Sequence, residues 1–67
     1  MKIILNDENY EVAESTSITM LFHKLGKDDT RGWAVAVNES IISKHDYDNT
    51  FLFDEDRVIL IQATQGG

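Results

Sequence analysis

The chain has 67 residues, no cysteine, and a formal net charge of −6 from 12 acidic and 6 basic side chains. This length allows one small domain, and the lack of cysteine excludes disulfides, iron–sulfur clusters and thiol nucleophiles. The negative charge disfavours nucleic acid and membrane surfaces as partners and favours a basic protein surface. Since the sequence carries neither an apolar run of membrane-spanning length nor a cleavable signal, we expect a cytoplasmic protein.

The first part of the sequence predicts a hairpin. Residues 1–5 are apolar and branched, as is typical of a strand, and residues 10–13 form the second strand in this interpretation. Between them lies the polar cluster of residues 6–9, whose Asn and Asp side chains favour a turn.

A single helix is predicted after the hairpin. Ser17 suits the N-cap, where its hydroxyl accepts a backbone N–H, and Gly26 suits the left-handed residue that ends a helix. The apolar residues between them recur at the spacing of one helical face: Ile18, Leu21, Phe22 and Leu25. Because two helical turns do not persist alone in water, this helix must lie on a sheet.

The rest of the sequence predicts three further short strands. They cover residues 33–37, 41–43 and 58–61, with turns at residues 38–40 and at the acidic residues 54–56. Tyr47 is the expected anchor of the polar segment 44–49. The order β-β-α-β-β-β predicts an α+β fold, in which one helix packs across one face of a mixed sheet of four to five strands. The first and last strands are the most hydrophobic, so we expect them in the centre of that sheet.

The sequence offers little chemistry of its own. Its two histidines, His23 and His45, lack neighbours at the spacing that metal sites need, and the acidic turn 54–56 lacks the spacing of a calcium loop. The sequence has no nucleophile elbow and no glycine-rich phosphate loop. We therefore expect no catalytic residue, no metal site and no bound cofactor, with His23 solvated on the polar side of the helix.

The last strand is apolar at successive positions, from Val58 to Ile61, and residues 3–5 share this property. Because side chains alternate across a strand and one helix covers only one face, about half of these residues should point away from the helix. The uncovered face is either covered by loops or forms an apolar patch that docks another protein.

The sequence ends in Gly66 and Gly67. Residues 63–67 carry nothing that would pack, so we divide the chain into a domain of residues 1–62 and a flexible C-terminal diglycine tail of residues 63–67. Glycine has no Cβ and accepts either sign of φ, so such a tail can thread a narrow channel and present the Gly67 carboxylate to the active site of another protein. A frayed end without function is the alternative.

Taken in order, these features resemble the ubiquitin-like β-grasp sulfur carriers, and most closely the ThiS sulfur carriers of thiamine biosynthesis. The resemblance covers the whole chain and includes the capped helix and the following segments: Ile3-Ile4-Leu5-Asn6, Ala34-Val35-Ala36-Val37-Asn38, Ile41-Ile42-Ser43-Lys44 and Gly66-Gly67. The chain departs from the family pattern where Lys44 replaces an arginine, Tyr47 a tryptophan, and Glu55 the glycine of an Asp-Gly-Asp turn.

The resemblance implies a ubiquitin-like β-grasp fold and a carrier that enzymes act on, rather than an enzyme. An adenylyltransferase related to ubiquitin-activating enzymes would consume ATP with magnesium to adenylate Gly67. Sulfur from a cysteine desulfurase persulfide would then convert Gly67 into a thiocarboxylate, which thiazole synthase would use to build the thiazole of thiamine. By the register of the family, Val58 and Leu60 face the helix, whereas Ile59 and Ile61 face the partners.

Two other interpretations fit the same sequence. The chain could be the small subunit of molybdopterin synthase or a carrier for another sulfur pathway, although the lack of insertions and the Lys44 and Tyr47 pattern favour the thiamine carrier. It could instead be a non-catalytic ubiquitin-like binding module whose tail is inert.

Overall fold

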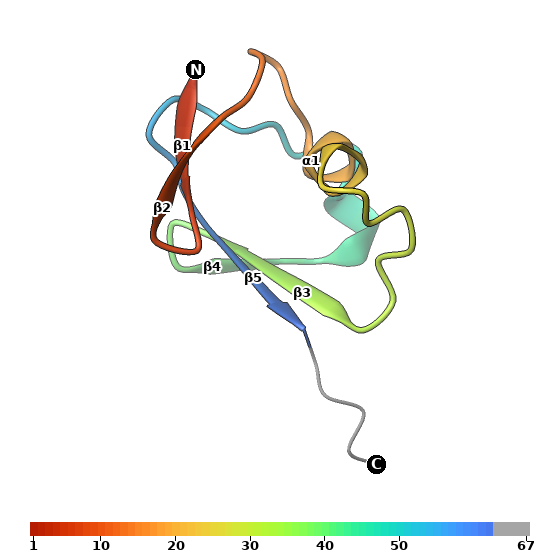
Figure 1. Cartoon of the computed structure of the whole chain (residues 1–67). Coiled ribbons are helices and arrows are strands. Elements are labelled where there is room, and N and C mark those ends of the chain that lie inside the picture. Colours follow the sequence, from red (N-terminus) through yellow and green to blue (C-terminus); the bar gives the residue numbers. More distant parts are fainter. Residues whose placement is uncertain (63–67) are drawn as a thin grey trace.

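Figure 1 shows the computed structural model of the chain, which describes residues 1–62. In this part of the chain, the strands and the helix follow each other in the predicted β-β-α-β-β-β order. Their bounds are β1 (Lys2–Leu5), β2 (Glu8–Glu11), α1 (Ile18–Lys24), β3 (Trp33–Val37), β4 (Ser40–Ile42) and β5 (Arg57–Gln62), with a 3₁₀ turn, η1 (Lys44–Asp46), between β4 and β5.

The strands form one mixed, five-stranded sheet in the order β2-β1-β5-β3-β4. β5, the last strand of the sequence, lies in the middle, parallel to β1 and antiparallel to β3. The two outer pairs, β1 with β2 and β3 with β4, are antiparallel hairpins. The predicted fold class is confirmed, and so is the central position of the first and last strands, because each has a neighbour on both sides.

Helix α1 begins and ends at the predicted residues. The Ser17 hydroxyl accepts the backbone N–H of Met20 at 3.1 Å, and Gly26 follows the helix with a φ of +76°. The buried residues of the helix are Ile18, Leu21 and Phe22. Local hydrogen bonds thus fix both ends of α1, while its apolar face supplies the tertiary contacts that so short a helix requires.

The core lies between α1 and one face of the sheet. Its largest fully buried side chains are Phe22, Ile3, Ile18, Leu21, Leu52, Val35 and Val58. Tyr47 joins them, since only 5% of it is exposed and its ring stacks on Phe22 with the centroids 5.6 Å apart. Burial raises the pKa of Tyr47, so its phenol stays neutral at physiological pH. The predicted role of Tyr47 as an anchor is therefore confirmed.

The first hairpin is tighter than the sequence indicates. The predicted turn at residues 6–9 is wrong, because only Asn6 and Asp7 form the loop, with φ angles of 49° and 70°, and β2 already begins at Glu8. Two-residue loops with positive φ at both positions match the twist of the flanking strands, which makes them the preferred hairpin connection. The strand predicted at residues 10–13 is accordingly shifted toward the loop, and its polar residues form an edge of the sheet.

The second hairpin differs from its prediction in the same way. Asn38 and Glu39 form its loop, with φ angles of 50° and 73°. Ser40, predicted in the turn, already pairs with Val37 as the first residue of β4. The strand predicted at residues 41–43 is therefore shifted by one residue, and Ser43 instead caps η1 by accepting the backbone N–H of His45 at 3.3 Å.

The predicted acidic turn before β5 is tied to β1. The backbone N–H of Glu55 donates to the Lys2 carbonyl at 2.6 Å, and the backbone N–H of Lys2 donates to the Asp54 carboxylate at 2.9 Å. Asp56 closes the turn by accepting the N–H of Phe53 at 2.8 Å. Glu55 adopts a φ of 71°, in the left-handed region where a residue with a Cβ is strained.

Replacing Glu55 by glycine should therefore stabilise the protein. Glu55→Gly relieves the left-handed strain and keeps the main-chain hydrogen bond to Lys2, so we expect the free energy of unfolding to rise by about 1 kcal/mol. The exposed Lys2–Glu55 ion pair, 3.9 Å long, contributes little to stability. Glu8→Gly, in β2, is the matched control and should lower stability by about 0.5–1 kcal/mol. Urea denaturation measures both, and a Glu55→Gly protein no more stable than the parent would contradict the prediction.

Candidate functional site

β5 carries the residues that the sequence predicts for docking. Val58 and Leu60 are buried in the core, at 0% and 8% exposure. Ile59 and Ile61 alternate with them and lie on the opposite side of the strand, where half of Ile61 is exposed. β5 is therefore apolar on both faces, although α1 covers only one.

Ile59 and Ile61 belong to a larger apolar surface. β3 pairs with β5 so that Ala36 lies opposite Ile59, and in the same register Ala34 lies opposite Ile61. Directly opposite residues share one face of a sheet. Ile41 of β4 lies opposite Ala36 and is 71% exposed. We name this surface the outer-face patch; its residues are Ala34, Ala36, Ile41, Ile59 and Ile61.

The two alanines shape the outer-face patch. The Ala36 methyl group lies between Ile41 of β4 and Ile59 of β5, and the Ala34 methyl group lies beside Ile61 of β5, so a low strip follows β3. The patch is uncharged, although the chain as a whole carries a net charge of −6. Ile41 and Ile61 are exposed, Ala34 and Ile59 are partly exposed, and Ala36 is buried among them at 9% exposure. A contiguous apolar surface of this kind is typical of a protein–protein contact.

The outer-face patch reaches the end of the described chain. Ile61 is followed by Gln62, which pairs with Trp33 as the last residue of β5. This end of β5 lies at the opposite side of the domain from the N-terminus (Figure 1). Gly66 and Gly67, the predicted reactive end, lie outside the described residues, so the structure places the predicted docking residues but not the predicted sulfur-carrying residue.

Aromatic contacts hold the start of β3 beside this end of β5, and an exposed ion pair lies in the loop before it. Trp33 packs edge-on against Phe22 with the centroids 6.4 Å apart, and the Lys27 ammonium lies 4.9 Å from the Trp33 ring centroid. Arg31 forms a bidentate pair with Asp29, with hydrogen bonds of 3.0 and 2.7 Å. These side-chain hydrogen bonds from Arg31 lower the pKa of Asp29 to about 2, so the pair is fully charged at neutral pH.

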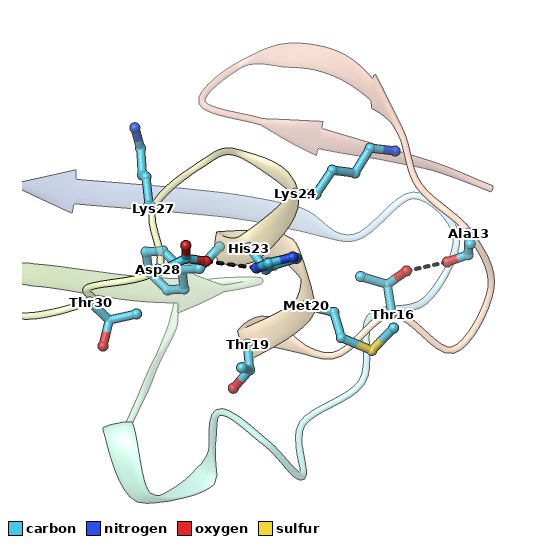
Figure 2. A pocket seen from close by; sticks show the side chains of 10 residues that line it. Ala13, Thr16, Thr19, Met20, His23, Lys24, Lys27, Asp28 and Thr30 are labelled. Atoms are coloured by element: carbon cyan, nitrogen blue, oxygen red, sulfur yellow. Dashed lines mark hydrogen bonds and ion pairs between the residues drawn. The ribbon is translucent and has the colours of Figure 1, made fainter.

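A hollow of about 550 Å³ beside α1 is a second candidate (Figure 2). Several of the polar groups that line it make local contacts. Thr16 donates to the Ala13 carbonyl at 2.6 Å, and His23 Nδ1 lies 2.6 Å from a carboxylate oxygen of Asp28. The His23 side chain is 80% exposed, as the sequence predicts. Since these groups serve the local structure around the helix ends, we assign the hollow no ligand.

The second histidine, His45, lies in η1 and is exposed. Among residues 1–62, no three His, Asp or Glu side chains gather in a way that could hold a metal ion. Within the same residues, no helix has both the length and the apolar character needed to cross a membrane.

The sequence predicted Ile59 and Ile61 for this surface but missed the alanines and Ile41. Part of the signal was present in residues 33–37, because strict alternation places both alanines on one face and the valines on the other. The missing information was that β3 lies beside β5, which the chain order does not state. The docking role of Ile59 and Ile61 stays a prediction.

One helix packed across a five-stranded sheet in the order β2-β1-β5-β3-β4 defines a ubiquitin-like β-grasp domain. The sequence model of the ThiS family matches residues 3–67, and the chain belongs to this family. The crystal structure of the thiamine biosynthesis protein (ThiS) from Geobacter metallireducens has the same fold, with a TM-score of 0.87 and 26% sequence identity over 100% of both chains. No curated protein matches the sequence.

Aspartate at neighbouring positions of β5 tests the assignment of its two faces. Leu60→Asp places a carboxylate in the core and should cost about 3 kcal/mol or more of folding free energy. Ile61→Asp places the carboxylate in solvent and should cost about 1 kcal/mol or less. Thermal unfolding followed by circular dichroism compares the two variants. Equal destabilisation would mean that the faces are assigned incorrectly.

Proposed function

We propose that this protein is a sulfur carrier of thiamine biosynthesis, and that it carries sulfur as a thiocarboxylate on Gly67. The observation that carries the proposal is the match of the ThiS family model, which runs through residue 67 and so includes Gly66 and Gly67. Similarity to the thiamine biosynthesis protein (ThiS) from G. metallireducens along the whole chain supports the same role. In this role the chain is a substrate of other enzymes and catalyses no step itself.

Activation of the Gly67 carboxylate is the first proposed step. A carboxylate is a poor acyl donor because oxide is a poor leaving group. In a partner adenylyltransferase related to ubiquitin-activating enzymes, a Gly67 oxygen would attack the α-phosphate of ATP and release pyrophosphate, with magnesium bound at the partner. The acyl-adenylate that results has AMP as its leaving group.

Replacement of AMP by sulfur is the second step. The terminal sulfur of a persulfide, formed through a cysteine desulfurase, would attack the Gly67 carbonyl carbon, so that a C–S bond forms as the bond to AMP breaks. A thiol would then cleave the remaining S–S bond, which gives a disulfide with the donor and leaves the thiocarboxylate on Gly67. Thiazole synthase would take this sulfur for the thiazole moiety of thiamine, and we expect these steps in the cytoplasm.

The described part of the chain suits delivery of Gly67 to such partners. β5 pairs with β3 from Val58 as far as Gln62, so the strand is held up to the point where residues 63–67 follow. Five residues span at most about 18 Å when fully extended. A partner that receives Gly67 must therefore dock close to Ile61, and the outer-face patch offers an apolar contact surface at that place.

Two alternatives receive less support. A carrier for another sulfur pathway, such as the small subunit of molybdopterin synthase, would use the same chemistry, but the family model that matches is that of ThiS. An inert ubiquitin-like module would share the fold without the chemistry, and measurement of the chain's mass distinguishes it from a carrier.

Intact-mass spectrometry tests the proposed chemistry. After incubation with a ThiS-activating adenylyltransferase, ATP, magnesium and a persulfide donor, we expect the mass increase that corresponds to replacement of one oxygen by sulfur. Deletion of Gly67 should abolish this increase. An extra residue after Gly67 should abolish it too, because the carboxylate becomes an amide. An unchanged mass of the parent chain would favour the inert module.

The stability of the Gly67 deletion provides the control for this experiment. The core of the described chain ends at Leu60, so the deletion should leave the melting temperature unchanged. A large drop in melting temperature would give the loss of sulfur acceptance a structural cause and would count against the proposal.

Ile61→Asp should weaken docking to the activating enzyme. The substitution places a charge within an apolar contact, where it must be desolvated on binding, so we expect the dissociation constant to rise about tenfold or more. Ile59→Asp should act in the same way. Met20→Asp adds the same charge at a 52% exposed position of α1 and is the matched control, which should bind as the parent does. Calorimetric titration measures all three, and an equal loss in the control would point to overall charge instead of the outer-face patch.

A further inference from the structure

Two phenylalanines are exposed near the beginning of β5. Phe51 and Phe53 are 48% and 70% exposed, whereas Leu52 between them is 2% exposed and belongs to the core. In an extended segment, alternate side chains share one side of the chain. Burial of Leu52 therefore turns both aromatic rings outward.

The backbone that presents these rings is fixed by hydrogen bonds. The Leu52 N–H donates to the Thr16 carbonyl at 2.8 Å, and the Phe53 N–H donates to the Asp56 carboxylate at 2.8 Å. Phe51 also forms an isolated β-bridge with the residue that caps α1. A partner that binds here would not have to order this segment, which lowers the entropic cost of association.

The two rings border a hollow of about 570 Å³ with an acidic rim. Glu14 and Asp54 line the hollow, and the exposed Glu55 follows Asp54. The N-terminal ammonium is engaged by Glu11 at 3.1 Å, and the nearby Lys2 ammonium lies 3.9 Å from Glu55. The groups that remain are the carboxylates of Glu14, Asp54 and Glu55 and the ammonium group of Lys2, so the net charge of the rim is negative.

We propose that this surface binds a basic protein segment in which an apolar side chain is flanked by arginine or lysine. We name it the Phe51–Phe53 surface; its residues are Glu14, Phe51, Phe53, Asp54 and Glu55. The apolar side chain of the partner fills the hollow beside the rings, and its basic side chains pair with the acidic rim. Charge complementarity selects this partner over a second copy of the chain, because each copy carries a net charge of −6.

The Phe51–Phe53 surface lies away from the chain end. It precedes β5, whereas the outer-face patch extends to Ile61, and Figure 1 places the segment before β5 near the N-terminus and away from the end of β5. A strand of this length spans about 17–20 Å. A partner on the Phe51–Phe53 surface therefore leaves the end of β5 free, so one protein can hold the carrier while another acts on Gly67. This last consequence rests on the proposed function, whereas the binding itself does not.

Titration of the ¹⁵N-labelled protein with synthetic peptides tests the proposal. The probe carries a central Leu-Trp pair between two arginines on each side. One matched peptide has glutamates in place of the arginines, and another has Ser-Ser in place of Leu-Trp. We expect saturable binding of the probe alone, with amide shifts concentrated at residues 14–15 and 51–55. Phe53→Ser should raise the Kd about tenfold, and the Ile61→Asp control should leave it unchanged.

Several outcomes would overturn the proposal. One is a set of amide shifts that is centred on the outer-face patch or scattered over the acidic residues. Another is binding of the Ser-Ser peptide with the same Kd as the probe. A third is a Phe53→Ser protein that binds the probe as tightly as the parent does. Phe53-dependent self-association in sedimentation, or Phe53-dependent binding to phosphatidylcholine vesicles, would assign the surface to a second copy or to lipid. Phe51→Ser repeats the test if the melting temperature shows that Phe53→Ser is unfolded.

The same preparations separate this proposal from the proposed function. Phe53→Ser should accept sulfur at Gly67 as the parent does, measured by intact mass. Loss of peptide binding with normal sulfur acceptance supports the Phe51–Phe53 surface alone. Normal peptide binding without sulfur acceptance by the parent chain would instead reject the carrier role and leave the surface in place.

Discussion

The whole fold depends on β5, which inserts between two strands that are distant in the sequence. The backbone N–H groups of Ile4 and Asn6 donate to the carbonyls of Asp56 and Val58 at 2.8 and 2.9 Å, and β3 pairs with β5 on the other side. Each hairpin pairs its own two strands, and within residues 1–62 it is β5 alone that joins the two hairpins in one sheet. A sheet broad enough to bury the apolar face of α1 therefore forms only when the last strand is in place.

Two asparagines connect the hairpin loops directly to this strand. The Asn6 side-chain oxygen accepts the Leu60 N–H at 2.9 Å, and the Asn38 side-chain oxygen accepts the Arg57 N–H at 3.0 Å. The Asn38 amide also donates to Asp56 at 3.0 Å. Both asparagines have positive φ, so each forms a tight turn and also satisfies a backbone group of the central strand. The short loops are thus part of the pairing of β5.

Features set by neighbouring residues could be predicted from the sequence. The Ser17 cap and the Gly26 helix end follow from capping, which acts over a few positions. Alternation predicts that β5 has two apolar faces, but the outward direction of Ile61 came from the register of the family that the sequence resembles. The hairpin boundaries could not be predicted, because Glu8 and Ser40 have polar side chains typical of turns and are strand residues only by virtue of their cross-strand partners.

The outer-face patch shows the same division between local and long-range information. Alternation predicts that Ala34 and Ala36 share a face, but the patch exists because β3 lies beside β5, and a pairing of non-consecutive strands has no local signature. The order of the strands in the sheet therefore had to come from the structure.

Exposed apolar surface and high net charge act together in this protein. One helix covers one face of the sheet, so the central strand must leave isoleucines on the other face, and the alanines of β3 limit how much apolar area is exposed when no partner is bound. Such a patch would favour self-association, but the charge of −6 opposes the approach of two copies. The same charge attracts basic surfaces. The net charge of −6 therefore causes both the repulsion between copies and the attraction to basic partners. Because of this repulsion, the outer-face patch can stay exposed without driving self-association of the carrier.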